Sequence, residues 1–396
     1  MRILVADDEP VNRLVISRKL RDWGHEVVEA VDGTDAWEKM QATPFRMVVS
    51  DWMMPGLDGV ELTRRIRANA FPGYTYVLLV TARSGIAALI EGMDAGADDF
   101  MVKPFQAEEL RARIRAGERV LQLESDLDER NARLTAAYSS AKRDLEAAAV
   151  MQKALLPAED LVLPGVQPAW RFLPASFVAG DVFNVQAIDE HRTLFYLLDV
   201  AGHGVPSAML SFSLSKLLVP AMGPDGLLKR AVETGDGWEL VPPAEVLRTL
   251  NERFQDDSDA MKYFTMVYGI IDARRDTVTI SQAGHPAPLL LRGDHVERLD
   301  DTGFPIGMLP GLQYEQYERP FLPGDRLVLY SDGVTECANP AREQFRLERL
   351  ESLMREVRHV ELPAAVARFE HVLRGWRGGD EFQDDVTFLA LERRAA

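Results

Sequence analysis

Short apolar runs alternate with amphipathic stretches along the first 118 residues of the chain. The runs lie at Arg2–Ala6, Glu26–Ala30, Met47–Ser50, Tyr76–Val80 and Asp99–Val102. Short runs rich in Val, Leu and Ile, separated by helical patterns, are typical of buried parallel strands in βαβ units. The pattern therefore predicts an α/β domain over residues 1–118, built on a doubly wound, parallel, five-stranded sheet.

Polar residues follow four of these predicted strands. Asp7 and Asp8 come after the first, Asp51 after the third, Thr81 after the fourth and Lys103 after the fifth. Because the carboxyl ends of parallel strands meet at one edge of the sheet, we expect these side chains to converge there. Carboxylates suit Mg²⁺, and a hydroxyl and an ammonium group can satisfy phosphoryl oxygens. Helix capping explains Asp7 or Asp8 alone equally well, but it does not explain the whole set.

Residues 1–118 resemble the receiver domain of two-component response regulators. The resemblance rests on Asp7-Asp8, on Asp51-Trp52-Met53-Met54-Pro55-Gly56, on Thr81-Ala82, and on Asp98-Asp99-Phe100 leading to Lys103-Pro104-Phe105. It implies that Asp51 accepts a phosphoryl group from the phosphohistidine of a sensor histidine kinase. It also implies that Asp8, Asp51 and the carbonyl group of Met53 bind Mg²⁺, with Asp7 close by through a water molecule.

The same resemblance assigns the residues that report phosphorylation. Thr81 and Phe100 match the switch pair of the family, and Lys103 matches its phosphate-sensing lysine. We therefore expect Thr81 and Phe100 to move toward the new phosphoryl group once Asp51 carries it.

The segment Gln106–Leu156 contains no proline and is interrupted only by Gly117, so it predicts one long helix. Apolar residues recur in it every seven positions, at Val120, Leu127, Leu134, Ala141, Ala148 and Leu155. The companion series is mostly polar, at Glu124, Asn131, Tyr138, Leu145 and Gln152, so any coiled-coil seam is weak. We expect residues 119–156 to form a helical coiled-coil linker in a parallel homodimer. The alternative is a solvated helix that packs against its own domains.

Beyond Pro157 the pattern changes to strands joined by short turns, with helices elsewhere, which predicts an α+β layered domain over residues 157–394. The predicted strands are Thr193–Val200, Thr265–Asp272, Thr277–Ala283, Arg326–Tyr330 and Val386–Leu391. The predicted helices are Ser207–Met222, Ala244–Phe254 and Arg346–Arg358.

Four acidic sites stand out in this domain. They are Gly180-Asp181, Asp199-Val200-Ala201-Gly202-His203-Gly204, Ser331-Asp332-Gly333 and Asp384-Asp385-Val386-Thr387. Ligand sets made only of oxygen favour Mg²⁺ or Mn²⁺ over zinc, and two such ions offset phosphoryl charge during in-line attack. A single Asp-Gly pair is more often a tight turn, but turns do not explain the set.

Residues 151–392 resemble the metal-dependent serine/threonine phosphatases of the bacterial sporulation and stress-response branch. Beyond the acids, the resemblance rests on Gln152-Lys153-Ala154-Leu155-Leu156-Pro157, Gly284-His285-Pro286-Ala287-Pro288, Pro305-Ile306-Gly307, and Pro323-Gly324-Asp325 through Tyr330-Ser331-Asp332-Gly333-Val334-Thr335-Glu336. It implies a β-sandwich phosphatase in which Asp199 bridges two Mn²⁺ or Mg²⁺ ions. Asp181, the Val200 carbonyl group, Asp332 and Asp384 complete that site.

The departures from this family's pattern are modest. Ala179 replaces the first glycine before Asp181, Asn184 stands where an acid is usual, and Ser331 replaces threonine. None removes an expected metal ligand, so we expect activity, with Asn184 weakening an outer metal contact. A general-acid role for His203 stays open, and the sequence names no phosphate-binding arginine.

By resemblance, the expected substrate is a phosphoserine protein of the anti-sigma-factor antagonist class. The alternative function is a phosphorylation-controlled adaptor or sequestering protein with a weakly active phosphatase domain. Gly378-Gly379-Asp380-Glu381-Phe382 spells the motif of diguanylate cyclases, but only a short tail follows it, so we take it as coincidence.

The amino-acid composition excludes several classes of binding partner and of cellular location. The formal net charge of −17 argues against nucleic acid and anionic lipid as partners. The single cysteine, Cys337, excludes an intramolecular disulfide. No apolar run approaches the about 18 residues of a membrane span, and acids follow too early for a signal peptide. We therefore expect a cytoplasmic protein without a membrane partner.

Overall fold

The computed structural model describes residues 1–82, 86–158, 160–202, 204–219, 227–231, 237–255, 263–300 and 303–395. His203 and the predicted end of the helix Ser207–Met222 lie outside these residues. The chain divides into two compact units, Met1–Ser140 and Ala141–Ala396.

The first unit contains one parallel sheet of five strands in the order β2-β1-β3-β4-β5. The strands are β1 (Arg2–Ala6), β2 (Glu26–Ala30), β3 (Met47–Asp51), β4 (Tyr76–Thr81) and β5 (Asp99–Val102). This is the doubly wound sheet that the alternation of apolar runs predicts, so that prediction is confirmed.

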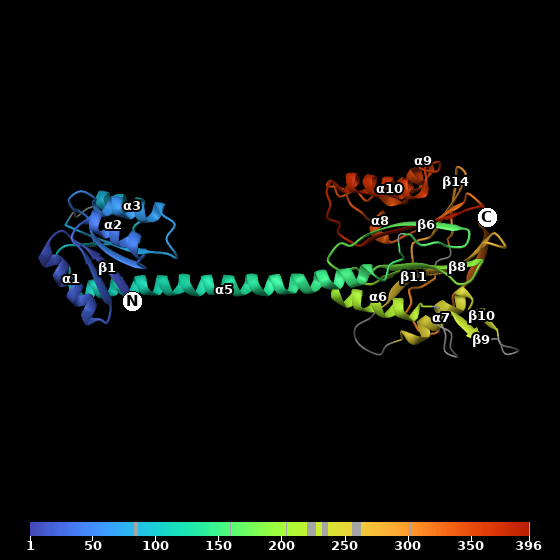
Figure 1. Cartoon of the computed structure of the whole chain (residues 1–396), viewed down its shortest axis with the longest axis horizontal. Helices are drawn as coiled ribbons and strands as arrows, with labels where there is room; N and C mark the ends of the chain where they lie inside the picture. The colour runs from blue at the N-terminus through green and yellow to red at the C-terminus, as the bar shows by residue number, and fades with distance from the viewer. Residues whose placement is uncertain are drawn as a thin grey trace. The chain divides into compact units, whose positions relative to one another are not determined.

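Helices cover both faces of this sheet. They are α1 (Pro10–Asp22), α2 (Gly33–Ala42), α3 (Gly59–Ala68), α4 (Ile86–Asp94) and α5 (Ala107–Lys153). Side chains of α1 and α5 share one hydrophobic core with the sheet, and those of α2 and α3 share the other. Figure 1 shows these helices beside the strands. Local signals start two of these helices: the carboxylates of Asp32 and Asp58 accept hydrogen bonds from the first turns of α2 and α3.

Helix α5 continues for 47 residues, which confirms the predicted long helix. Leu110, Ile114 and Leu121 anchor its first turns in the core of the first unit. Gly117 permits this close packing, because a Cβ atom there would lie 2.5 Å from the Met47 Cε atom. The division between the two units falls within α5.

The second unit is a sandwich of two antiparallel, five-stranded sheets, in the orders β15-β12-β11-β8-β7 and β14-β13-β16-β17-β6. The strands are β6 (Val166–Leu173), β7 (Val182–Ala187), β8 (Arg192–Val200), β11 (Phe264–Asp272), β12 (Thr277–Ala283), β13 (Leu289–Arg292), β14 (His295–Arg298), β15 (Gln316–Pro320), β16 (Arg326–Tyr330) and β17 (Val386–Arg393). A short hairpin, β9 (Lys229–Ala231) and β10 (Trp238–Leu240), lies apart from both sheets.

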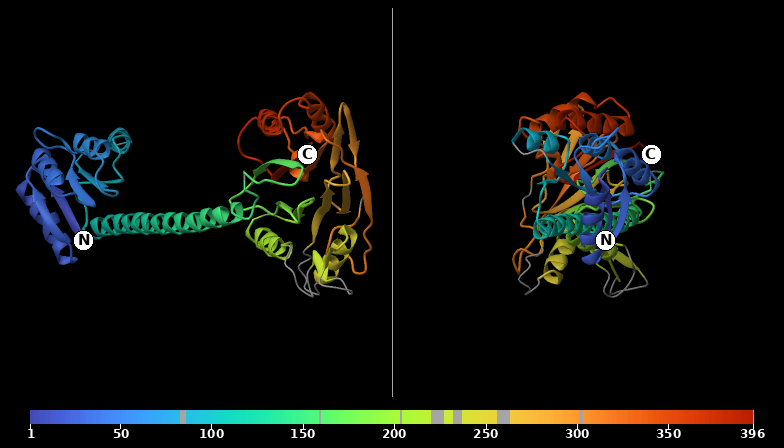
Figure 2. Two further views of the ribbon diagram at one scale, coloured as in Figure 1. Left: turned by 45° about the vertical axis from the view of Figure 1, so that its right-hand side comes forward. Right: turned by 90° about the vertical axis from the view of Figure 1, so that its left-hand side faces the viewer.

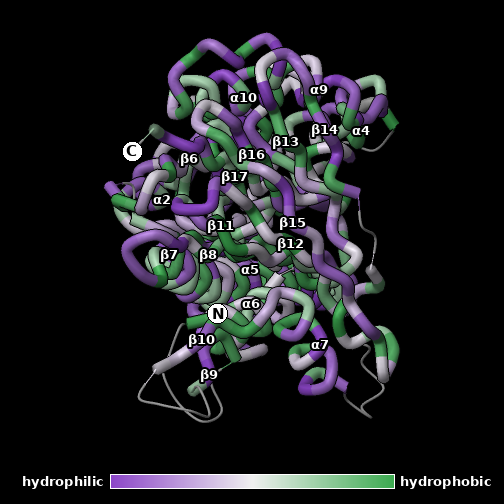
Figure 3. Tube along the Cα trace, turned by 90° about the vertical axis from the view of Figure 1, so that its right-hand side faces the viewer, coloured by the Kyte–Doolittle hydropathy of each residue, from purple (hydrophilic) through white to green (hydrophobic). Residues whose placement is uncertain are grey.

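Helices cover the outer faces of this sandwich. They are α6 (Val205–Leu217), α7 (Pro243–Arg253), the short α8 (Asp332–Thr335), α9 (Arg346–Glu356) and α10 (Leu362–Arg377). One apolar cluster fills the space between the sheets, and two others lie under α6 and α7 and under α9 and α10. The two helix layers lie on opposite sides of the strands in both views of Figure 2. Apolar positions recur along the strands in Figure 3.

The layered β-sandwich is therefore confirmed, although the sequence pattern predicted only part of it. Five strands of the two sheets (β6, β7, β13, β14 and β15), the last two residues of β17 and the helix α10 were not predicted. None of the helices in the described parts of the chain is both long and apolar enough to cross a membrane.

Candidate functional site

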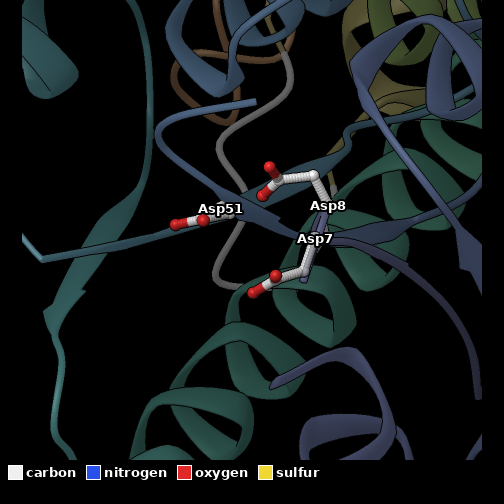
Figure 4. Close-up of side chains that lie close together, drawn as sticks. All are labelled: Asp7, Asp8 and Asp51. Atoms are coloured by element: carbon white, nitrogen blue, oxygen red, sulfur yellow. The ribbon is translucent and has the colours of Figure 1, made fainter. Parts of the chain in front are cut away.

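Three carboxylates meet at the carboxyl edge of the first sheet. Asp7 and Asp8 directly follow β1, and Asp51 ends β3, which pairs with β1. One oxygen atom from each lies within 4.8 Å of the others, and Figure 4 shows the three side chains together. Asp7 is buried, Asp51 is partly buried and Asp8 is exposed, so the set of oxygen atoms reaches from the interior to solvent. This donor set suits Mg²⁺.

Lys103 supplies a positive charge to this edge. Its Nζ atom lies 2.9 Å from Asp7 Oδ2 and 3.2 Å from Asp51 Oδ2. Burial opposes the charge of Lys103, but its contacts with the two acids outweigh burial and raise its pKa. Burial also raises the pKa of Asp51, against the lowering effect of Lys103. The lysine thus contacts the carboxylate that the sequence predicts as phosphoacceptor.

The remaining predicted receiver residues lie around this edge. The Trp52 amide donates to Asp51 Oδ1 at 2.9 Å, which holds the carboxylate in place. Met53, the next residue, is 59% exposed. Thr81 is buried at the end of β4, and Phe100 lies on the neighbouring strand β5, partly buried.

A second group of carboxylates meets where the two sheets of the sandwich come together. Asp181 directly precedes β7, and the pairing of Val182 with Leu198 brings it beside Asp199 near the end of β8. On the other sheet, Asp332 follows β16 and Asp384 precedes the paired strand β17. We call Asp181, Asp199, Asp332 and Asp384 the acid cluster.

Hydrogen bonds join the two sheets at the acid cluster. The Thr387 hydroxyl on β17 donates to Asp181 Oδ2 at 2.6 Å. The two carboxylate oxygens of Asp385 accept from the amides of Ala175 (2.8 Å) and Gly180 (2.7 Å). The Ser331 hydroxyl donates to the Asp385 carbonyl oxygen at 3.1 Å and accepts from the Thr387 amide at 3.0 Å. Asp385 and Thr387 belong to the motif Asp384-Asp385-Val386-Thr387, but the sequence did not predict these roles for them.

Burial and mutual repulsion dominate the electrostatics of the acid cluster. Burial, followed by the charges of Asp332 and Asp384, raises the pKa of Asp199 to about 7. Burial and the charge of Asp199 raise the pKa of Asp181 well above its usual range, and burial and Asp384 raise that of Asp332. Within the described residues, no lysine or arginine forms an ion pair with any of the four. Oxygen donors with uncompensated charge are of the kind that binds divalent cations such as Mg²⁺ or Mn²⁺. Among the described acids, the group whose oxygen atoms lie within 4.8 Å of one another is the one at the edge of the first sheet.

Gln152, near the end of α5, holds the segment that leads into Asp181. Its side-chain amide donates to the Ala179 carbonyl oxygen at 2.8 Å, and its Oε1 atom accepts from the Ala179 amide at 2.9 Å. Gln152 is buried although its neighbours along the helix are exposed. The sequence signal for this contact is a single glutamine among apolar residues before Pro157. Gln152 is part of the family motif quoted above, but its contact with Ala179 was not predicted.

His285, in the predicted Gly284–Pro288 motif, supports the strand opposite Asp199. Its Nδ1 atom lies 2.8 Å from the Thr265 hydroxyl, and Thr265 pairs with Asp199 between β11 and β8. Burial lowers the pKa of His285 to about 3, so the imidazole is neutral at physiological pH. It therefore supports the site as a hydrogen-bonding group and carries no charge.

Two of the residues that depart from the family pattern, Asn184 and Ser331, make described contacts near the acid cluster. Asn184 lies on β7 opposite Tyr196 on β8, and its Oδ1 atom accepts from the Val185 amide at 2.8 Å. Ser331 is fully buried, and its hydroxyl makes the two contacts given above. Val200, the last residue of β8, is buried. The general-acid question for His203 lies outside the described residues.

Comparison with known proteins places both units in families. The family model "Stage II sporulation protein E (SpoIIE)" matches residues 189–394, and the model "Response regulator receiver domain" matches residues 3–115. The SpoIIE match includes Asp199, Asp332 and Asp384, whereas Asp181 precedes it.

Curated relatives match one unit each. Phosphoserine phosphatase RsbP of Bacillus subtilis is 33% identical over 201 residues, covering 49% of this chain and 46% of RsbP. Transcriptional regulatory protein TcrA of Mycobacterium tuberculosis is 41% identical over 116 residues, covering 29% of this chain and 45% of TcrA. The chain thus spans about half the length of the curated relatives it matches.

A solved structure, the SiaA-PP2C domain of Pseudomonas aeruginosa, shares the fold with a TM-score of 0.54 at 22% identity. It covers 65% of this chain and 98% of that domain. The family model for the second unit extends over more than half of the chain, and it is preceded by a matching receiver domain. The chain therefore belongs to the Stage II sporulation protein E (SpoIIE) family, and the region that matches the response regulator receiver domain precedes its SpoIIE region.

Proposed function

We propose that this chain is a response regulator in which phosphorylation of Asp51 controls a metal-dependent protein phosphatase acting on phosphoserine or phosphothreonine. The observation that carries the proposal is the acid cluster, in which four carboxylates share one site without a described cationic partner. The proposed domains are the receiver (1–118), the linker (119–156) and the phosphatase (157–394).

In the receiver, Asp51 takes the phosphoryl group from a sensor histidine kinase. Mg²⁺ would be held by Asp8, Asp51 and the Met53 carbonyl group, with Asp7 close by through a water molecule, and it would offset the charge of the incoming phosphoryl group. Lys103 already contacts Asp51, so it is placed to pair with the phosphoryl oxygens on the same carboxylate. Thr81 and Phe100 then act as the switch pair next to that group.

In the phosphatase, two Mn²⁺ or Mg²⁺ ions would be held by Asp199, Asp181, Asp332, Asp384 and the Val200 carbonyl group. When bound, these ions activate water and offset the phosphoryl charge of the substrate. Thr387 and Asp385 position this set: Thr387 orients the Asp181 carboxylate, and Asp385 fixes the Gly180 backbone next to it. Neither is assigned as a metal ligand, so both act by holding the ligands of the acid cluster in position.

The proposed substrate class is supported by a relative of the second unit and by the family resemblance of its sequence. RsbP, whose name describes a phosphoserine phosphatase, aligns with this unit over 201 residues. We therefore propose a phosphoserine-bearing anti-sigma-factor antagonist as the substrate.

The two activities are coupled through α5 in a parallel homodimer. Val120, Leu127 and Leu134 lie seven residues apart on α5 and are 37%, 53% and 70% exposed. A second copy of the same helix presents the same spacing, so the two stripes can pair along a weak seam. The seam ends beside Gln152, whose contact with Ala179 connects the helix to the residue pair before Asp181.

Phosphate release from phosphoserine and phosphothreonine proteins tests the phosphatase proposal. The full chain is incubated with Mn²⁺ and with phosphorylated anti-sigma-factor antagonists, with synthetic phosphopeptides as the simpler substrates. We expect Mn²⁺-dependent release, which a chelator abolishes. A wild-type protein that releases no phosphate from any of them at saturating Mn²⁺ would favour the adaptor function instead.

A further inference from the structure

The second unit contains a pocket of about 220 Å³ that the proposed function leaves without a role. Residues that follow α8, the last residue of α10 and the segment before β17 line it. The lining includes Gly333 and Asp384 together with Glu336, Cys337, Arg377 and Phe382. Arg377 directly precedes the glycine-rich motif Gly378–Phe382, and Phe382 is the last residue of that motif.

The pocket adjoins the acid cluster. Asp384 belongs to both, and Gly333 directly follows Asp332. A Cβ atom on Gly333 would lie 2.1 Å from the Asp385 carbonyl oxygen, so the start of α8 packs directly on the backbone before β17. This contact fixes the pocket relative to both acids. A substrate whose phosphoryl group lies at the acid cluster therefore has the pocket beside it.

Arg377 is the basic side chain that lines the pocket, and its described partners are neutral. Its Nε atom donates to the Glu381 carbonyl oxygen at 3.1 Å, and its Nη1 atom donates to the Ala338 carbonyl oxygen at 3.4 Å. Arg374, one turn earlier on α10, is different: its guanidinium pairs with Glu370 at 2.9 Å and with Asp380 at 3.0 Å. Among the described residues, Arg377 forms no such ion pair, so its charge is not neutralised by a carboxylate.

The charge of Arg377 acts inside the pocket. Burial raises the pKa of the Cys337 thiol, and the nearby charge of Arg377 partly opposes this shift. The two described contacts use Nε and Nη1 as donors to carbonyl oxygens, and Nη2 takes part in neither. A guanidinium group whose remaining N–H donors are unused is suited to bind a carboxylate or a phosphoryl group through two parallel hydrogen bonds.

We propose that this pocket receives an anionic group of the phosphoprotein substrate and that Arg377 binds it. The proposal rests on the phosphatase function and names a substrate contact for it. Two parts of such a substrate have the required chemistry: the phosphoryl group itself and an acidic side chain next to the phosphoserine. The negative charges of Glu336 and Asp384 disfavour any anion in the pocket, so binding depends on Arg377 and on the metal ions held beside it.

Steady-state kinetics of the full chain with Mn²⁺ and three substrates tests this proposal. The substrates are p-nitrophenyl phosphate, a phosphoserine peptide with glutamates beside the phosphoserine, and the same peptide with glutamines in their place. Arg377→Ala and Arg377→Lys are compared with the wild type. Arg368→Ala is the matched control, because Arg368 lies on the same helix and pairs on the surface with Glu356 at 3.3 Å. Thermal unfolding of each variant shows whether the loss of the contacts to Ala338 and Glu381 affects folding.

We expect Arg377→Ala to lower kcat/KM by on the order of 10- to 100-fold, Arg377→Lys by less, and Arg368→Ala not at all. A loss on all three substrates assigns Arg377 to the phosphoryl group, and a loss confined to the glutamate peptide assigns it to the flanking side chain. An active wild type whose kcat/KM is unchanged by Arg377→Ala on every substrate would overturn the pocket assignment alone. The assignment would also be overturned if Arg368→Ala lowered kcat/KM as much as a well-folded Arg377→Lys does. A wild type without turnover would contradict the phosphatase function, and the pocket assignment with it.

Discussion

Gln152 and Ala179 are joined by two hydrogen bonds, one in each direction, between a side-chain amide and a backbone peptide group. The glutamine belongs to α5, and the alanine lies two residues before Asp181. Both groups are buried, so neither can exchange its partner for water at low cost. The end of the long helix is thereby connected through the backbone to a member of the acid cluster.

Gln152→Ala should weaken metal binding by the phosphatase and lower its stability by about 1–3 kcal/mol, because the amide and carbonyl groups of Ala179 lose buried partners. We expect a higher Mn²⁺ concentration at half-maximal rate and a lower melting temperature. Gln122→Ala is the matched control, since Gln122 lies on the same helix but is exposed and pairs with Asp126. An unchanged Mn²⁺ dependence in Gln152→Ala would show that this contact does not position Asp181.

Asp199→Asn should abolish hydrolysis while leaving the fold intact. The loss should exceed the about 10- to 100-fold effect that is typical of residues outside the metal ligands. Phosphate release measures the activity, and calorimetry with Mn²⁺ measures metal binding. Asp294→Asn is the control, because Asp294 is exposed and pairs with Arg358 on the surface. Turnover close to wild type in Asp199→Asn would contradict the assignment of Asp199 as a metal bridge.

Without metal, the phosphatase unit should lose stability as the pH rises from about 4 to 7. The pKa of Asp199 is raised to about 7, so the folded state keeps its proton over this range while the unfolded state releases it. A folded state that binds more protons loses stability with increasing pH, here by a few kcal/mol at most. Denaturant titrations of chelated protein at several pH values measure this change. Adding Mn²⁺ should reverse the trend, because metal binding favours the charged carboxylates.

Asp199→Asn should also reduce the pH dependence of the metal-free protein, because it removes one of the titrating and mutually repelling groups. A metal-free wild type whose stability rises steadily from pH 4 to 7 would contradict the electrostatic description of the acid cluster.

The edge of the first sheet was predictable because the apolar runs mark β1, β3 and β5 and each is followed by a polar residue. In parallel βαβ units that order places Asp7, Asp51 and Lys103 at the same edge of the sheet, where the structure brings them together. The contacts of Lys103 with both acids depend on side-chain reach, which a strand pattern does not specify.

The second unit was less predictable, because antiparallel strands far apart in sequence form its site. The strands β6 and β15 have few continuous apolar residues, since they lie at sheet edges and are half exposed. The roles of Thr387 and Asp385 depend on the packing of one sheet on the other, which no local pattern reports. The same holds for Arg377, whose helix α10 was missed altogether.

Replacing both Leu127 and Leu134 by Asp should uncouple the receiver from the phosphatase without unfolding either. Both side chains are exposed in the single chain, so the charges disturb only a seam between two copies. We expect sedimentation to show a monomer and the basal phosphatase rate to lose its response to an acyl phosphate. Exposed Ser139 and Ser140 lie on the same helix, and replacing both by Asp serves as the control for added charge. A full response in the Leu127/Leu134 variant would rule out coupling through this seam.

In the proposed function, phosphorylation of Asp51 changes the rate of the phosphatase on the same chain. The most direct measurement is phosphate release from a phosphoserine substrate with Mn²⁺, with and without acetyl phosphate, in the wild type and in Asp51→Asn. We expect a change of about fivefold or more in the wild type and none in Asp51→Asn, whose basal rate stays measurable. An equal change in both proteins, or no change in a wild type shown by mass spectrometry to be phosphorylated on Asp51, would contradict it.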